Sequence, residues 1–182
     1  MQTGEICEPE VTPQSNIGRS GWYAVYAKHQ HEKNAAQVLQ EKGFEVFLPL
    51  LQEKRRWKDR IKQIRIPMFP CYLFVRVATD RKVEILQAPG VFWIVEAAGR
   101  PCLVPDEEIE AIRKVAGAKV RVEAHPYLDR GTTVRVTKGA LAGLTGILSR
   151  VKKEDRVVVS LKLLKKAISV EVDRADLEHV SI

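Results

Sequence analysis

Cysteine is scarce in this chain of 182 residues, which carries only Cys7, Cys71 and Cys102 and no C-x-x-C pair. That count excludes a disulfide-stapled secreted domain and favours a reducing compartment, so we expect a cytoplasmic protein. No apolar run approaches the roughly 20 residues of a membrane span. Residues 1–20 also lack the apolar core of a signal peptide, and we interpret them as a disordered tail.

Catalytic motifs are missing as well. The sequence contains no glycine-rich phosphate loop, no H-E-x-x-H and no nucleophile elbow. The spacing His29-x-His31 directs the two rings apart on a helix, which argues against a shared metal. The cysteines and histidines do not form a metal-ligand cluster in the sequence; they are Cys7, Cys71, Cys102, His29, His31, His125 and His179. We therefore expect no enzyme, no cofactor and no metal.

Positive charge is present and concentrated. The chain has a net charge of +7, and the segment from Lys54 to Arg65 holds seven basic residues and one acid, so nearly all of the excess lies there. One interpretation is a solvated hairpin tip; the other is an arm that contacts phosphates, with Trp57 available to stack on a base. The candidate nucleic-acid contacts in this arm are Lys54, Arg55, Arg56, Lys58 and Arg60.

The first two thirds of the chain alternate between strand and helix patterns. Aromatic and β-branched residues predict the first strand at 22–27, and Ala35, Val38 and Leu39 form a helical stripe that Gly43 ends, with Phe44 packing back on Leu39. The remaining predicted elements are strands at 45–51, 71–77 and 91–97, a short helix capped by Asp80, and a helix from Pro105 to Gly117. This order predicts an antiparallel sheet with helices packed on it.

The last third contains strand patterns only. Residues 118–127 have no helical pattern and are predicted to be a linker. Four to five short strands after Gly131 predict a small barrel, because closure removes exposed edges. Gly139, Gly143 and Gly146 lie in one connection, where we expect positive φ angles or a close backbone approach. The predicted fold class is α+β, organised as a tail (1–20), an N-terminal domain (21–117), a linker (118–127) and a barrel (128–182).

Three segments resemble the NusG family of transcription elongation factors. VRVTKGALAGLTGILSRV resembles its KOW motif, a small SH3-like barrel, whereas WYAVYAKHQHEKNAAQVLQEKG and PMFPCYLFVRV resemble the opening and the signature of its N-terminal (NGN) domain. The likeness runs from Gly21 to about Val180. Cys71 stands where the general factors have glycine, which is similar to specialised antitermination paralogues of the RfaH, UpxY and LoaP kind.

The resemblance implies a non-catalytic elongation or antitermination factor that suppresses pausing. It implies that Tyr26, Tyr72 and Phe74 bind the clamp helices of the largest RNA polymerase subunit; the alternative is that these aromatics are core. It also implies contact of Lys28, His29 and His31 with the non-template DNA strand. The barrel would recruit the ribosomal protein NusE or Rho; its candidate residues are Leu141, Leu144, Val157, Val159 and Leu161, with Leu141 equally expected in the core.

We expect a monomer without membrane contact. The alternative function is an RNA-binding or ribosome-associated KOW protein, because a sheet of this kind joined to a KOW barrel can bind RNA directly. The aromatic strand at 71–77 lacks the Arg-Gly opening that is typical of an RNA-recognition strand.

Overall fold

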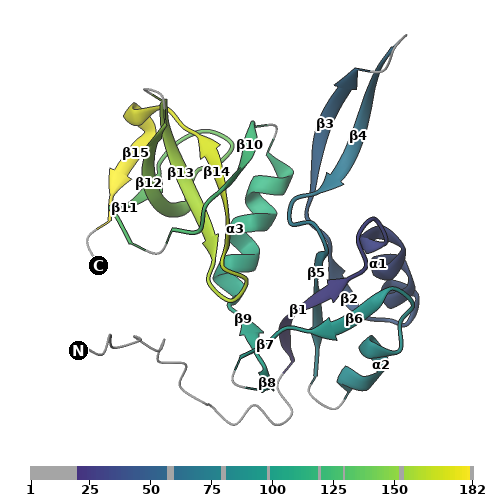
Figure 1. The fold of residues 1–182 in the computed structure, drawn as a ribbon. Coiled ribbons are helices and arrows are strands. Elements are labelled where there is room, and N and C mark those ends of the chain that lie inside the picture. The colour runs from purple at the N-terminus through teal and green to yellow at the C-terminus, as the bar shows by residue number, and fades with distance from the viewer. Residues whose placement is uncertain are drawn as a thin grey trace, which may run out of the picture.

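The computed structural model describes residues 20–56, 60–78, 81–97, 99–118, 120–128, 130–151 and 154–180. Its N-terminal part is built on an antiparallel sheet with the strand order β2-β5-β1-β6, and β9 also pairs with β1 (Figure 1). The strands are β1 (Gly21–Ala27), β2 (Glu45–Phe47), β5 (Tyr72–Val77), β6 (Val91–Ile94) and β9 (Leu103–Val104). The predicted antiparallel sheet flanked by helices is confirmed.

Three helices follow the predicted positions. They are α1 (Glu32–Glu41), α2 (Lys82–Leu86) and α3 (Asp106–Gly117). Helix α1 ends as its glycine predicts: Gly43 has a φ of +82°, and the backbone N–H of Phe44 donates to the Leu39 carbonyl at 3.1 Å. Asp80, the predicted cap of α2, lies outside the described residues.

The two faces of the sheet pack against different partners because side chains alternate along each strand. Tyr23, Val25 and Leu73 are buried together with residues of α1 and α2. Trp22 and Phe74 point the other way and share an apolar cluster with the buried face of α3. Figure 1 shows α1 and α2 on one side of the sheet and α3 on the other.

The C-terminal part is a six-stranded antiparallel sheet with the order β10-β14-β13-β12-β11-β15, curled around its own interior. Its strands are β10 (Val122–His125), β11 (Thr133–Val136), β12 (Thr145–Val151), β13 (Glu154–Leu161), β14 (Lys166–Glu171) and β15 (Leu177–His179), with a 3-10 helix at Arg174–Asp176. The segment predicted as a linker differs from expectation, because β10 pairs with β14 from Val122 to His125. This pairing covers an edge of β14 that would otherwise be open.

The three glycines of the β11–β12 connection serve the two purposes that the sequence predicts. Gly139 and Gly143 have φ angles of +78° and +80°, in the left-handed region that favours glycine. A Cβ on Gly146 would lie 2.5 Å from the Val158 carbonyl oxygen, so this position needs glycine for space. The connection is therefore shaped by the barrel itself.

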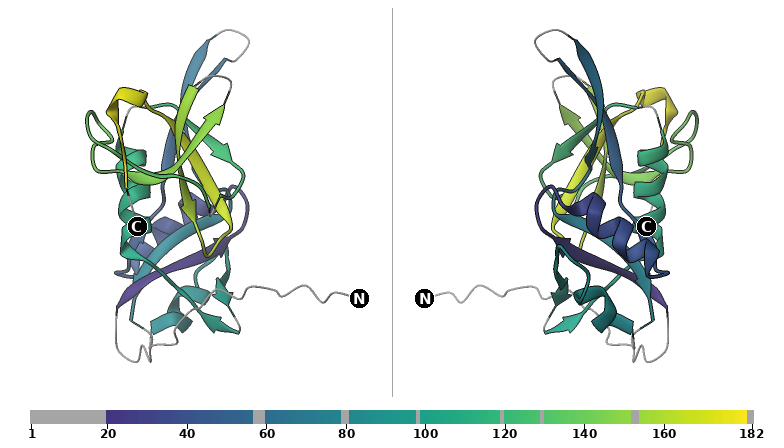
Figure 2. Two further views of the ribbon diagram at one scale, coloured as in Figure 1. Left: turned by 90° about the vertical axis from the view of Figure 1, so that its left-hand side faces the viewer. Right: turned by 90° about the vertical axis from the view of Figure 1, so that its right-hand side faces the viewer.

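The N-terminal and C-terminal parts pack on one another. Ile109 and Ile112 of α3 belong to the same buried apolar cluster as Val157 and Leu161 of the barrel. The Lys114 ammonium of α3 donates to the Ala142 carbonyl oxygen of the barrel at 2.7 Å. Figure 2 shows the C-terminal sheet lying alongside α3 in both views. The sheet face that carries Trp22 and Phe74 is thus covered by α3 and the barrel together.

Two hairpins stand outside these sheets. Strands β3 (Leu50–Arg56) and β4 (Ile61–Pro67) pair only with each other in the described chain and project from the body of the molecule (Figures 1 and 2). The predicted basic arm is therefore a β-hairpin. The short strands β7 (Glu96–Ala97) and β8 (Arg100–Pro101) form the second hairpin. Within the described residues, no helix has the length and apolar character needed to cross a membrane.

A candidate aromatic docking surface

Aromatic side chains form a row across three strands of the N-terminal sheet. Tyr26 on β1 pairs with Tyr72 on β5 and with Trp93 on β6. The Tyr26 and Trp93 rings stack with centroids 4.2 Å apart and planes 5° apart, and the Tyr72 ring meets Tyr26 edge-on at 5.2 Å. Phe92 stacks at 6.2 Å from Tyr26. We call Tyr26, Tyr72, Phe92 and Trp93 the aromatic surface.

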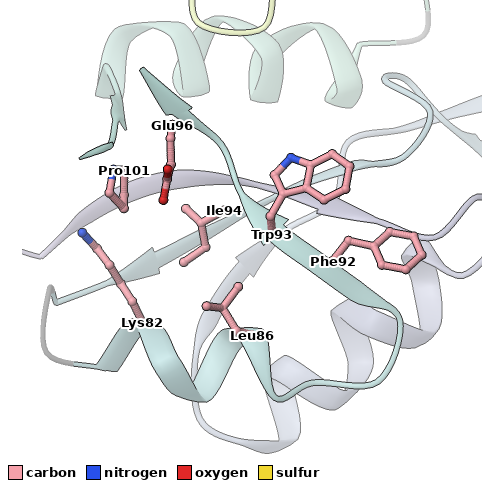
Figure 3. A pocket seen from close by; sticks show the side chains of 7 residues that line it. All are labelled: Lys82, Leu86, Phe92, Trp93, Ile94, Glu96 and Pro101. Atoms are coloured by element: carbon pink, nitrogen blue, oxygen red, sulfur yellow. The ribbon is translucent and has the colours of Figure 1, made fainter. Parts of the chain in front are cut away.

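Much of this surface is open to solvent. Phe92 is 56% exposed and Trp93 is 51% exposed, whereas Tyr26 and Tyr72 are half-buried. A depression of about 470 Å³ lies along the same edge, between β6 and α2 (Figure 3). Its lining residues are Lys82, Leu86, Phe92, Trp93, Ile94, Glu96 and Pro101. Exposed aromatic clusters of this kind mark interaction sites, because they bury large areas with few rotatable bonds.

Phe74 does not belong to this surface, and its predicted role as a surface contact is corrected by its position. Its exposed fraction is 0%, and its ring packs against Phe47 at 6.1 Å and against Phe69 at 6.5 Å. Phe74 lies two residues beyond Tyr72 on the same face, where α3 closes over the sheet. The sheet face is therefore divided into a covered part and an open part.

Phe92 and Trp93 were not among the residues predicted from the sequence. Alternation along a strand assigns two adjacent residues to opposite faces, so the pattern offers no reason to group them. The register of β1 against β6 shifts between Tyr26 and Ala27, and this irregularity brings both rings near Tyr26. The sequence feature that could have identified them is a pair of adjacent large aromatic residues on β6, a short strand at the edge of the sheet.

Hydrogen bonding and burial raise the pKa values of the two tyrosines of this surface. A side-chain hydrogen bond with Cys71 raises the pKa of the Tyr26 hydroxyl, and the charge of an ionised Cys71 adds to the effect. Burial raises the pKa of Tyr72, with a further contribution from the Cys71 charge. Both hydroxyls therefore stay neutral donors at physiological pH.

The turn after β1 places Lys28, His29 and His31 at the same end of the sheet as Tyr26, and all three are exposed. His29 also meets two residues from elsewhere in the chain. Its Nδ1, the Cys71 Sγ and a carboxylate oxygen of Glu32 all lie within 4.8 Å of one another. The sequence predicted no metal-ligand cluster, because it compared only cysteines and histidines along the chain, whereas the fold adds a glutamate and joins two distant turns.

The basic hairpin carries most of the predicted nucleic-acid contacts. Strand β3 includes Lys54, Arg55 and Arg56, Arg60 precedes β4 and is exposed, and Lys58 lies outside the described residues. Seven of the twelve residues from Lys54 to Arg65 are basic and one is acidic, so the hairpin concentrates the positive charge of the chain.

The barrel residues predicted to recruit a partner are interior residues instead. The exposed fraction of each of the five residues is between 0% and 5%; the residues are Leu141, Leu144, Val157, Val159 and Leu161. Alternation along β13 turns the odd-numbered valines and Leu161 into the barrel, and Leu141 and Leu144 close its end as the connection folds back. These side chains stabilise the barrel and offer no surface for docking.

Comparison with known proteins agrees with this architecture. The NusG family, described as "Transcription termination factor nusG", matches residues 20–113. The "Transcription termination/antitermination protein NusG" of Thermus thermophilus is 28% identical over 173 residues, covering 84% of this chain and 94% of that protein. The protein of the same name from Halalkalibacterium halodurans is 24% identical over 174 residues, covering 87% and 98%.

A solved structure described as "Domain interaction in Thermotoga maritima NusG" is similar in fold. Its TM-score is 0.54 at 19% sequence identity, and the match covers 90% of this chain and 98% of that one. The family match extends over more than half of the chain, and the fold it predicts is the one observed. The chain belongs to the NusG family.

Proposed function

We propose that this protein is a transcription termination/antitermination factor that acts without catalysis, by binding RNA polymerase through the aromatic surface. The observation that carries the proposal is the open row of Tyr72, Tyr26 and Trp93, with Phe92 beside it, on a domain that matches the NusG family. Rings that stack on each other are already ordered, so binding costs little side-chain entropy. The relatives named for termination and antitermination support the same function.

The partner element that suits this surface is a coiled coil of the polymerase clamp. The depression beside Trp93 is lined by the apolar residues Leu86 and Ile94 and by the charged residues Lys82 and Glu96, among others (Figure 3). An amphipathic helix with large apolar residues spaced by three and four positions fits such a groove, with its charged flank near the lysine and the glutamate. Binding that favours the active polymerase over the paused one would suppress pausing.

The barrel lies next to one end of this surface. The Lys166 ammonium is 5.5 Å from the centre of the Tyr72 ring, and Leu163 and Leu164 of the same turn pack on the shared core. A polymerase helix and this turn would therefore compete for Tyr72. We propose that the barrel recruits a second protein, NusE or Rho, through exposed residues, because the five apolar candidates lie in its interior.

Nucleic acid is the proposed partner of the β3–β4 hairpin. Arg56 and Arg60 are exposed near its tip, and seven of the twelve residues from Lys54 to Arg65 are basic. Lys28, with His29 and His31, offers a second contact for the non-template strand beside the aromatic surface. Each phosphate that the hairpin neutralises releases counterions, so this contribution weakens as salt rises.

Co-purification with RNA polymerase tests the function. The full-length double variant Tyr26→Ala, Trp93→Ala removes the stacked pair at the centre of the surface. We expect it to lose polymerase binding while keeping its fold by circular dichroism. Tyr127→Ala is the matched control, because Tyr127 is a half-buried aromatic between β10 and β11 and is not one of the four residues of the aromatic surface.

A folded double variant that still binds polymerase as the wild type does would contradict the proposed docking surface. Tight binding of free RNA at physiological salt by a protein that ignores polymerase would favour the RNA-binding alternative. The two outcomes are distinguished by adding each partner separately to the same preparation.

A further inference from the structure

Three potential metal ligands converge beside the aromatic surface from separate parts of the chain. His29 lies in the turn after β1, Glu32 is the first residue of α1, and Cys71 immediately precedes β5. The Cys71 Sγ and the His29 Nδ1 are 3.8 Å apart, and with a Glu32 carboxylate oxygen all three atoms lie within 4.8 Å. Among the described residues this is the single grouping of three such side chains.

Backbone strain is concentrated in the two turns that form this cluster. Cys71 has a φ of +68°, and Gln30, next to His29, has a φ of +64°. Positive φ is unfavourable for residues that carry a Cβ, and such strain persists where the surrounding structure imposes it, often at functional sites. A glycine would adopt the Cys71 conformation freely, so the cysteine side chain at this position carries a conformational cost.

Burial of the glutamate adds a second argument. Glu32 is only 3% exposed, and its Oε1 accepts a hydrogen bond from the Cys71 backbone N–H at 2.9 Å. This hydrogen bond fixes the carboxylate beside the Cys71 turn, and a carboxylate oxygen lies within 4.8 Å of both the thiol sulfur and the imidazole nitrogen. A divalent cation bound between them would take ligands from two separate turns.

The donor set selects the class of metal. Thiolate, imidazole and carboxylate together suit zinc and related transition metals, whereas calcium and magnesium prefer oxygen ligands alone. With metal–sulfur and metal–nitrogen distances of about 2.3 and 2.0–2.1 Å, a tetrahedral site sets sulfur and nitrogen about 3.6 Å apart. The observed 3.8 Å separation is close to that value without any rearrangement.

We propose that His29, Glu32 and Cys71 bind a divalent transition metal of the zinc class, with water or an exogenous ligand at the fourth position. The site goes beyond the proposed function, and its test needs no polymerase. Because Cys71 immediately precedes Tyr72, which pairs with Tyr26 across β1 and β5, the metal would lie at the margin of the aromatic surface. Metal binding would lock the turn after β1 to the turn before β5.

Cobalt is the probe, because a thiolate–Co²⁺ bond gives a charge-transfer band in the near ultraviolet and tetrahedral Co²⁺ absorbs in the visible. Titration of the reduced full-length protein with Co²⁺ is expected to develop both features at one equivalent, and Zn²⁺ is expected to displace them. Cys71→Ser and His29→Gln each remove one ligand and should weaken binding by at least about tenfold. Cys71→Gly removes the thiol while relieving the left-handed strain, so it separates ligand loss from misfolding.

Matched controls come from the same sequence. Cys102→Ser removes a thiol outside the cluster, and His31→Gln removes an exposed imidazole two residues from His29. Both variants should bind Co²⁺ as the wild type does. The proposal is overturned if the wild type shows no thiolate–Co²⁺ band, or if the band survives in Cys71→Gly, or if it disappears in a control variant.

Alkylation provides an independent measurement. Iodoacetamide labelling followed by peptide mass spectrometry reports each cysteine separately, and Zn²⁺ is expected to protect Cys71 while leaving Cys102 reactive. Equal labelling of Cys71 with and without Zn²⁺ would identify a thiol without metal and would also overturn the proposal.

Discussion

Replacing Phe74 by alanine tests the division of the sheet into covered and open parts. Phe74 is fully buried and contacts two further rings, Phe47 and Phe69, so its removal leaves a cavity between the sheet and α3. Phenylalanine-to-alanine changes in cores cost about 3–5 kcal/mol, and the lost ring contacts place this one near 4 kcal/mol. Folded domains have about 5–15 kcal/mol of stability, so the variant is expected to fold with a reduced margin.

Urea denaturation followed by tryptophan fluorescence measures the effect. With a slope of about 2 kcal/mol per molar urea, a loss of 4 kcal/mol lowers the midpoint by about 2 M. Tyr72→Ala is the comparison, because Tyr72 lies on the same strand and face but is half-buried. Its midpoint should fall by about 0.5–1 M, which corresponds to roughly 1–2 kcal/mol.

Tyr72→Ala should weaken polymerase binding more than Phe74→Ala does, although it should destabilise the fold less. Tyr72→Ala removes part of the aromatic surface and should weaken binding by about tenfold or more, a loss of at least about 1.4 kcal/mol. Phe74→Ala should bind like the wild type under conditions where it is folded. A Phe74→Ala midpoint within 0.5 M of the wild type, or a direct loss of affinity from the folded variant, would refute the assignment of Phe74 to the core.

Two further predictions concern the barrel and its contact with α3. Gly146→Ala should destabilise the protein by about 2 kcal/mol or more, because the new Cβ would lie 2.5 Å from the Val158 carbonyl oxygen. Gly139 has open space around it, so Gly139→Ala should cost about 1 kcal/mol from the positive φ alone. Equal denaturation midpoints for the two variants would contradict this ranking. Burial raises the pKa of Glu108, whose Oε2 has no hydrogen-bond partner among the described residues. The folded protein therefore holds this proton to higher pH than the unfolded chain, so wild-type stability falls as pH rises from the ordinary glutamate pKa through the raised one. Glu108→Gln should lose that component in melting curves recorded as the pH rises above the ordinary glutamate pKa of about 4.3, and an unchanged pH profile would contradict it.

Local features of the fold could be predicted from the sequence because each depends on neighbouring residues. The end of α1 at Gly43, with Phe44 bonded back to Leu39, follows from glycine geometry and helix periodicity. The basic arm between Lys54 and Arg65 follows from local composition, whereas its two strands come from the pairing of Leu50–Arg56 with Ile61–Pro67. The conformations of Gly139 and Gly143 follow in the same way.

Which of these strand residues are exposed and which are buried could not be predicted in the same way. Period two places Tyr72 and Phe74 on one face, which is correct, but the pattern does not say how far along that face α3 and the barrel extend. The valines of β13 have a similar ambiguity, because an apolar strand residue gives the same sequence pattern whether it faces a partner protein or the interior of its own barrel. Burial is decided by elements that are distant in sequence.

The sequence by itself determined the positions of the three helices, the glycine-dependent turns, the basic arm and the resemblance to the NusG family, because these depend on periodicity and on residue types within short stretches. Only the tertiary structure decided that Phe74 is covered, that Phe92 and Trp93 complete the aromatic row, and that His29 and Glu32 meet Cys71. The physical reason is the same in each case. Strand register, a shifted pairing and the position of a packed helix bring together residues about 40 or more positions apart, and short-range patterns do not encode those distances.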